Sequence, residues 1–227
     1  GSDQVYHFDN TNWTNSASYR NPVMAGAHDI DAIAIDPNDP KHIFAATFGS
    51  GVYEIYNDSA IKKYDESNSA LAHHTVSSVD DIRVAGLAFD ADGNLWAACS
   101  HNNKCLSMKK GDTWTGYTVP IVNEDELGPL LVDKDGQVWV QMRYKTQNTN
   151  SILVFSNNGT PDNTADDKSI LLNANAGSGN IPGTTVYAMA GATALKQEPS
   201  VAEAIETLGF VEPDRNSNPA MEFSPPV

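Results

Sequence analysis

The segment AFDADGNLWAAC, residues 88–99, decides the fold of this chain of 227 residues. A short apolar run enters an Asp-Gly turn, and a second apolar run that carries Trp96 leaves it. An Asp-Gly pair supplies the backbone conformation that a tight hairpin turn requires, and apolar runs on both sides are typical of buried strands. The segment therefore predicts a β-hairpin with a buried second strand.

The same pattern occurs at two other places, as AIDPNDPKHIFAAT at residues 34–47 and as LVDKDGQVWVQM at residues 131–142. The first aspartates of the three copies are Asp36, Asp90 and Asp133, so the period is roughly 40 to 55 residues. Four short strands fill such a period, and repeats of this length are typical of the blades of a β-propeller.

We therefore predict an all-β chain, a β-propeller that is either a partial or a small ring, built of four-stranded antiparallel blades over residues 1–190. First strands should be nearly all apolar, because they are buried between neighbouring blades. The expected strands are Ala32–Ile35, Ala85–Phe89 and Pro129–Val132 (first), Gly51–Tyr56, Lys104–Met108 and Ser151–Phe155 (third), and Ile61–Tyr64, Trp114–Val119 and Ser169–Leu172 (outer). Residues 5–14 are similar to a third and an outer strand, and Thr184–Ala190 to the first strand of a further blade, which favours a fragment of a larger ring.

Three aromatic residues stand at equivalent places in the second strands of the repeats. They are Phe44, Trp96 and Trp139. Large aromatic rings contribute much of the apolar area buried in a core, so we expect these rings to pack between blades.

The repeat is not continued after Ala190, where no further Asp-Gly turn follows. Ser200-Val-Ala-Glu203 has the pattern of a capping box and predicts a short helix at about 201–208, which Gly209 ends. We expect residues 191–227 to be an atypical tail that is irregular beyond this helix.

Charge and composition exclude several classes of protein. Hydrophobic residues make up 40% of the chain, enough for a globular core. The 29 acidic and 14 basic residues give a formal net charge of -15, which repels a phosphate backbone and argues against nucleic acid as a partner. No apolar run is long enough to predict a membrane span. No signal peptide is visible, and the opening Gly1-Ser2 is typical of a cleaved purification tag, so localisation has to be argued indirectly.

Two cysteines, Cys99 and Cys105, flank a predicted turn near Asn102. On neighbouring strands of a hairpin their sulfurs would face one another, which would allow a disulfide and would fit an oxidising compartment. Two thiols are the alternative. A zinc site is disfavoured, because it requires four ligands and only His101 lies nearby.

The loop Asn157–Asp167 concentrates side-chain oxygens around a glycine and a proline. Hard cations prefer such oxygens, so Asp162, Asp166 and Asp167 are candidate ligands of Ca²⁺. Their spacing does not match an EF-hand, and a β-turn with an Asx cap explains the same residues. We expect no other cofactor.

A cationic and aromatic cluster, Arg143, Tyr144 and Lys145, stands out in an acidic chain. Such a cluster could receive a sugar phosphate or a carboxylate, and it is our candidate binding site for an anionic glycolipid or polysaccharide. An ordinary solvated hairpin tip is the alternative. Motifs of known catalytic sites, such as a nucleophile elbow or a phosphate-binding loop, are absent from the sequence, so we expect binding and not catalysis.

The Asp-x-Asp-Gly-x-hydrophobic-Trp pattern resembles the two-component-regulator type of propeller repeat. More narrowly, the chain is similar to the second propeller of the PorZ family of the type IX secretion system of Bacteroidetes, over about residues 1–190. The segments that carry this narrower resemblance are DPNDP (36–40), FGSGVYE (48–54), YDESNSAL (64–71), NGTPD (158–162) and IPG (181–183). The departure from the repeat after Ala190 is not typical of the family.

The resemblance implies a periplasmic or outer-surface scaffold, a secretion-system protein as partner, and help in delivering anionic lipopolysaccharide to the machinery that attaches cargo proteins. It implies no catalytic residues. Two alternatives stay open: a glycan-sensing ectodomain of a hybrid two-component regulator, and a propeller enzyme that acts on polysaccharides.

Overall fold

The computed structural model describes residues 4–17, 21–75, 81–122, 126–143, 151–172 and Met189. Its regular structure is almost entirely β-strand, as predicted. The strands are β1 (Val5–Phe8), β2 (Trp13–Ala17), β3 (Ile30–Asp36), β4 (Asp39–Gly49), β5 (Gly51–Tyr56), β6 (Ser59–Tyr64), β7 (Ile82–Phe89), β8 (Leu95–Cys99), β9 (Leu106–Lys110), β10 (Thr113–Tyr117), β11 (Leu127–Val132), β12 (Val138–Met142), β13 (Ile152–Ser156) and β14 (Lys168–Leu172). Short 3-10 turns are η1 (Pro22–Met24), η2 (Pro120–Val122) and η3 (Thr164–Asp166).

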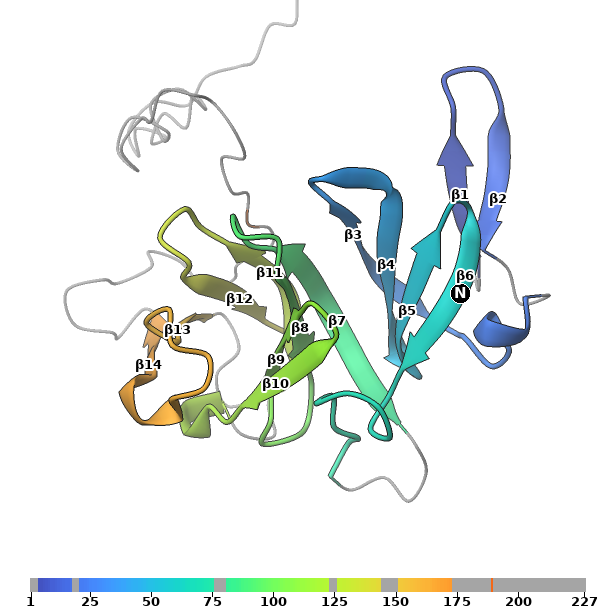
Figure 1. Cartoon of the computed structure of the whole chain (residues 1–227). Coiled ribbons are helices and arrows are strands. Elements are labelled where there is room, and N and C mark those ends of the chain that lie inside the picture. Colours follow the sequence, from blue (N-terminus) through green and yellow to red (C-terminus); the bar gives the residue numbers. More distant parts are fainter. Residues whose placement is uncertain are drawn as a thin grey trace, which may run out of the picture. The chain divides into compact units, whose positions relative to one another are not determined.

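The strands form four-stranded antiparallel meanders that we call blade 1 (β3–β6), blade 2 (β7–β10) and blade 3 (β11–β14) (Figure 1). Strands β1 and β2 form a separate two-stranded sheet that precedes blade 1. The end of β4 pairs with the start of β7, which joins blades 1 and 2. This is the predicted order of two strands followed by whole blades.

Strand limits agree with the repeat most closely where the turns are short. The expected third strand Gly51–Tyr56 coincides with β5, whereas β9 begins at Leu106, two residues after the expected start at Lys104. The expected strand Thr184–Ala190 and the expected helix at about 201–208 lie outside the described residues. In the described part of the chain, no helix is long and apolar enough to span a membrane.

The hydrophobic cores lie between neighbouring blades, and blades 1 and 2 each bury both of their faces. Along β8, Leu95, Ala97 and Cys99 belong to the core shared with blade 1. Trp96 and Ala98, which alternate with them, belong to the core shared with blade 3. Alternation of this kind follows from the two-residue period of a strand. A third core connects Val5 of β1 with the opposite face of blade 1.

Phe44 and Trp96 pack between blades as predicted, in the two cores that connect complete blades, whereas Trp139 is only partly buried and belongs to neither core. Trp96 is only 2% exposed, and its ring stacks on Tyr117 and meets the edge of Phe155 in blade 3. Phe44 is buried and contacts Phe89 of blade 2 edge to face. Phe44 of β4 and Trp96 of β8 hold equivalent positions in their blades. Each pairs with the corresponding residue of the strand before it, near the end of that strand's apolar run.

The two cysteines are buried thiols without a disulfide between them. The backbone N–H of Cys99 donates to the carbonyl of Cys105 at 2.8 Å, so the hairpin forms as expected. Their side chains nevertheless belong to different cores, Cys99 to that of blades 1 and 2 and Cys105 to that of blades 2 and 3. The structure thus has the two-thiol alternative, and a disulfide between Cys99 and Cys105 stays a prediction. Burial raises the pKa of Cys99 to about 12, which keeps its thiol protonated.

Candidate functional site

In blade 2 one aspartate closes the hairpin turn and also binds the ring of the second strand. Asp90 Oδ1 accepts the backbone N–H groups of Asp92 at 3.0 Å and Asn94 at 2.8 Å. Its Oδ2 accepts the indole N–H of Trp96 at 3.0 Å. The carboxylate therefore fixes the shape of the turn and the orientation of the buried indole together.

The same arrangement recurs in the other blades. Asp133 accepts the indole N–H of Trp139 at 2.8 Å. In blade 1, Nδ1 of His42 lies 3.3 Å from Asp36, so the histidine takes the place of the indole N–H while Phe44 supplies the packing ring. Sequence reasoning missed this bond, although the equal spacing of aspartate and tryptophan in two copies was a signal for it.

Asp90→Ala should lower the free energy of unfolding by about 2 kcal/mol, because it removes the acceptor of four N–H groups, of which water can reach only those of the turn. Urea denaturation of both proteins measures the difference. Asp92→Ala is the matched control, since Asp92 is an exposed residue of the same turn. Equal losses in the two variants would contradict this role of Asp90.

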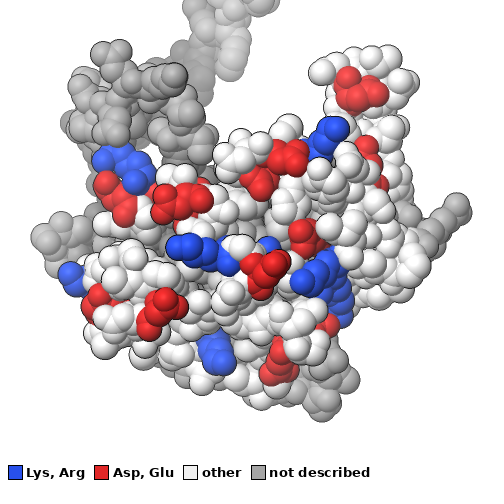
Figure 2. All heavy atoms as spheres, in the orientation of Figure 1, with Lys and Arg blue, Asp and Glu red and all other residues white. Residues whose placement is uncertain are grey.

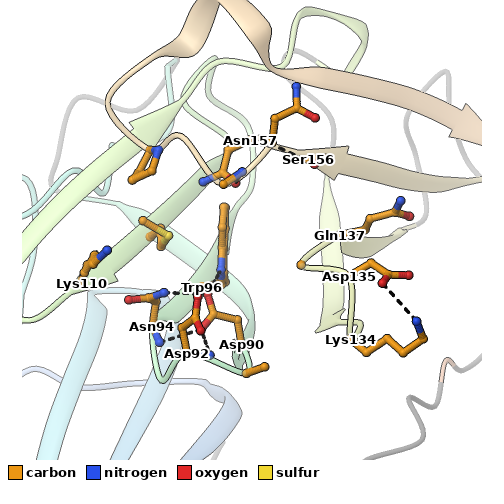
Figure 3. A pocket seen from close by; sticks show the side chains of 16 residues that line it. Asp90, Asp92, Asn94, Trp96, Lys110, Lys134, Asp135, Gln137, Ser156 and Asn157 are labelled. Carbon is orange, nitrogen blue, oxygen red and sulfur yellow. Dashed lines mark hydrogen bonds and ion pairs between the residues drawn. The ribbon is translucent and has the colours of Figure 1, made fainter. Parts of the chain in front are cut away.

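A groove of about 550 Å³ lies between the turns of blades 2 and 3 (Figure 3). One wall is the turn at residues 90–94, and the other is the turn at residues 134–137. The loop at residues 156–161, which follows β13, completes the lining. Figure 3 shows Asp92 and Asn94 on one side of the groove and Asp135 and Gln137 on the other. A volume of this size is typical of a ligand site.

The groove lining is mostly polar and slightly acidic. Its charged residues are the carboxylates Asp90, Asp92 and Asp135 and the ammonium groups of Lys110 and Lys134. Lys134 lies 3.1 Å from Asp135, so its charge is compensated within the same wall. The groove is therefore a poor site for a strongly anionic ligand.

Of the cationic cluster predicted to bind an anion, the structure describes Arg143, whereas Tyr144 and Lys145 lie outside the described residues. The Arg143 guanidinium binds Asp31 of β3 at 2.9 Å and lies over the ring of Phe48. Arg83 of β7 lies over the same ring and binds Asp81 through two N–H groups. Residues from three blades thus meet at this place.

Each of these arginines has a carboxylate partner. A surface pair of this kind contributes little stability, but Arg143 and Asp31 come from blade 3 and blade 1, so their bond restrains the arrangement of the blades. Binding of an anion by Arg143 would have to compete with Asp31. Binding of an anionic ligand by the cluster at Arg143, Tyr144 and Lys145 stays a prediction.

In the acidic loop, Asp166 accepts the hydroxyl of Thr160 at 2.9 Å, and Asn163 caps η3 by accepting the N–H of Ala165. Burial and the neighbouring Asp166 raise the pKa of Asp167, while Asp162 is exposed. Within the described ranges, no three His, Cys, Asp or Glu side chains are grouped as metal ligands would be. The capped-turn alternative therefore explains the geometry, and binding of Ca²⁺ by Asp162, Asp166 and Asp167 stays a prediction.

No known protein family matches the chain, and no curated protein matches it. Among solved structures, it is similar to PorZ of Porphyromonas gingivalis, described as an essential surface component of the type-IX secretion system. The identity is 29% and the TM-score 0.65, over 74% of this chain and 23% of PorZ. The chain thus spans about a quarter of the length of PorZ. The resemblance inferred from the sequence segments is confirmed.

More distant matches are an extracellular domain of a putative one-component system from B. thetaiotaomicron and YCF48 from Cyanidioschyzon merolae. The first has 18% identity and a TM-score of 0.40, over 61% of this chain and 17% of that domain. The second has 15% identity and a TM-score of 0.46, over 77% of this chain and 55% of YCF48.

Proposed function

We propose that this chain is part of a non-catalytic propeller that acts as a binding scaffold in type IX secretion, in the periplasm or on the outer cell surface. The observation that carries the proposal is its similarity to PorZ, at 29% identity and a TM-score of 0.65 over 74% of the chain. The hydrogen bonds of Asp90 and Asp133 support a non-catalytic role, because both carboxylates already accept backbone N–H groups of their turns and indole N–H groups.

The finer part of the proposal is that the protein helps to deliver anionic lipopolysaccharide to the machinery that attaches cargo proteins. A net charge of -15 repels a polyanion over most of the surface. Figure 2 shows acidic and basic residues mixed on the face drawn, and no large patch of one sign. Such a ligand would therefore be bound locally, at a cluster such as Arg143, Tyr144 and Lys145.

Deletion of the complete gene in the bacterium that encodes this chain tests the proposal. We expect type IX cargo to disappear from the cell surface, since the scaffold that brings lipopolysaccharide and cargo together would be missing, and expression of the full-length gene should restore it. Immunoblots of surface and periplasmic fractions measure the cargo. Normal surface attachment in the deletion strain would refute the proposed role, and a cytoplasmic membrane protein serves as the fractionation control.

A further inference from the structure

We propose that the groove between the turns of blades 2 and 3 binds a short segment of an uncharged, hydroxyl-rich glycan. The inference deepens the proposed binding function and rests on it, because a scaffold at the bacterial surface works among polysaccharides. It assigns a place and a ligand chemistry that the cationic cluster at Arg143, Tyr144 and Lys145 does not supply.

The walls of the groove are held in shape before any ligand binds. In the first wall, the N–H of Gly93 donates to the carbonyl of Asp90, and the Asp90 carboxylate takes two further N–H groups of the turn. In the second wall, Asp133 takes the same bonds, including that from the N–H of Gln137 at 2.9 Å. Rigid walls reduce the entropy cost of binding.

Several polar side chains of the groove lining are available to a ligand. In the part of the chain that the structure describes, the carboxylate of Asp92 and the side-chain amide of Gln137 make no hydrogen bond within the protein. The amide N–H of Asn94 binds Asp90, which leaves its oxygen as an acceptor. These groups lie on both walls (Figure 3).

The available groups match sugar hydroxyls, each of which donates one hydrogen bond and accepts others. Carboxylate and amide oxygens accept from hydroxyls, and the amide of Gln137 also donates. The apolar side chain of Pro161 lines the same groove and can contact the C–H face of a sugar ring, while Met108 beneath it is buried. The slight excess of carboxylates selects against a phosphate or an acidic sugar.

The hairpin of blade 1 differs from those of blades 2 and 3, because β3 and β4 continue to Asp36 and Asp39 and leave only residues 37–38 for the turn. Asn38 of that turn lies so close to Gly93 that a Cβ on the glycine would be 3.3 Å from its side-chain nitrogen. The groove thus lies where two Asp-x-Asp-Gly turns, those of blades 2 and 3, are neighbours.

Isothermal titration of the full chain with cellotriose, mannotriose and chitotriose tests the proposal, with trigalacturonate as the anionic counterpart. We expect at least one neutral trisaccharide to bind. The variant Asp92→Asn/Gln137→Ala should weaken its affinity about tenfold or more, as the loss of one or two hydrogen bonds implies. Asp112→Asn changes an exposed aspartate outside the groove and should leave the affinity unchanged.

Absence of binding by all neutral trisaccharides, tighter binding of trigalacturonate, or equal affinity of the groove variant and the parent would overturn the assignment. Circular dichroism of both variants verifies that they fold. If glycans fail to bind while gene deletion abolishes cargo attachment, the groove assignment alone falls. If glycans bind while deletion has no effect, the secretion role alone falls.

Discussion

Trp96→Ala lowers the free energy of unfolding by about 4 kcal/mol, the typical cost of removing a fully buried tryptophan. The indole is 2% exposed in the core shared by blades 2 and 3. Its ring centroid lies 5.3 Å from that of Tyr117 and 6.1 Å from that of Phe155. Truncation leaves a cavity between blades and removes the indole donor from Asp90. Urea denaturation followed by circular dichroism measures the loss.

Two further variants separate packing from hydrogen bonding. Trp96→Phe keeps most of the ring contacts and removes the indole N–H, so it should cost clearly less than the alanine variant. Trp139→Ala makes the same chemical change at the equivalent place in blade 3, where the side chain is only partly buried. Equal losses of unfolding free energy in Trp96→Ala and Trp139→Ala would contradict the prediction that burial of Trp96 in the core between blades 2 and 3 makes its loss costly.

Gly86→Ala should lower the free energy of unfolding by about 3 kcal/mol, the upper part of the usual range for overpacking. A Cβ on Gly86 of β7 would lie 2.7 Å from both the carbonyl oxygen of Gly128 and the N of Leu130 in β11. These are backbone atoms, which cannot rotate away, so the first strands of blades 2 and 3 would have to separate. Thermal and urea unfolding measure the effect.

Gly136→Ala is the control for this prediction. Gly136 has a φ of +76°, but a Cβ there would meet nothing within 4 Å, so the variant has only the cost of a left-handed backbone, about 1 kcal/mol. The close approach of β7 and β11 would be disproved if Gly86→Ala were no more destabilising than Gly136→Ala.

The blades could be predicted from the sequence because their signals are local. An Asp-Gly turn between two apolar runs specifies a hairpin within a dozen residues, and β5 coincides with its expected limits. Burial of Phe44 and Trp96 followed from the alternation along their strands. The hydrogen bond between Asp90 and Trp96 also joins residues close in sequence. It depends on the Asp90 side chain reaching across the turn to the indole, which a pattern of apolar residues does not describe.

Contacts between blades could not be predicted in the same way. The sequence marked Arg143 as a cation, yet its partner Asp31 lies two blades earlier, and only the packing of the blades brings them together. The groove has the same origin, since its walls are turns from different blades. The cysteines show what strand pairing alone does not predict. A hairpin determines which backbones are neighbours, but irregular residues after a strand can change the face on which the next side chain lies.

The sharing of β8 between two cores has a consequence for how the protein comes apart. Leu95 and Ala97 are buried against blade 1, and Trp96 and Ala98 against blade 3, so neither neighbour can detach without exposing one side of this strand. The stability of a repeat depends on its own contacts and on its interfaces with neighbouring repeats. The unfolding of blade 2 is therefore coupled to that of blade 1 and of blade 3, and a change in either core lowers the stability of both blades that share it.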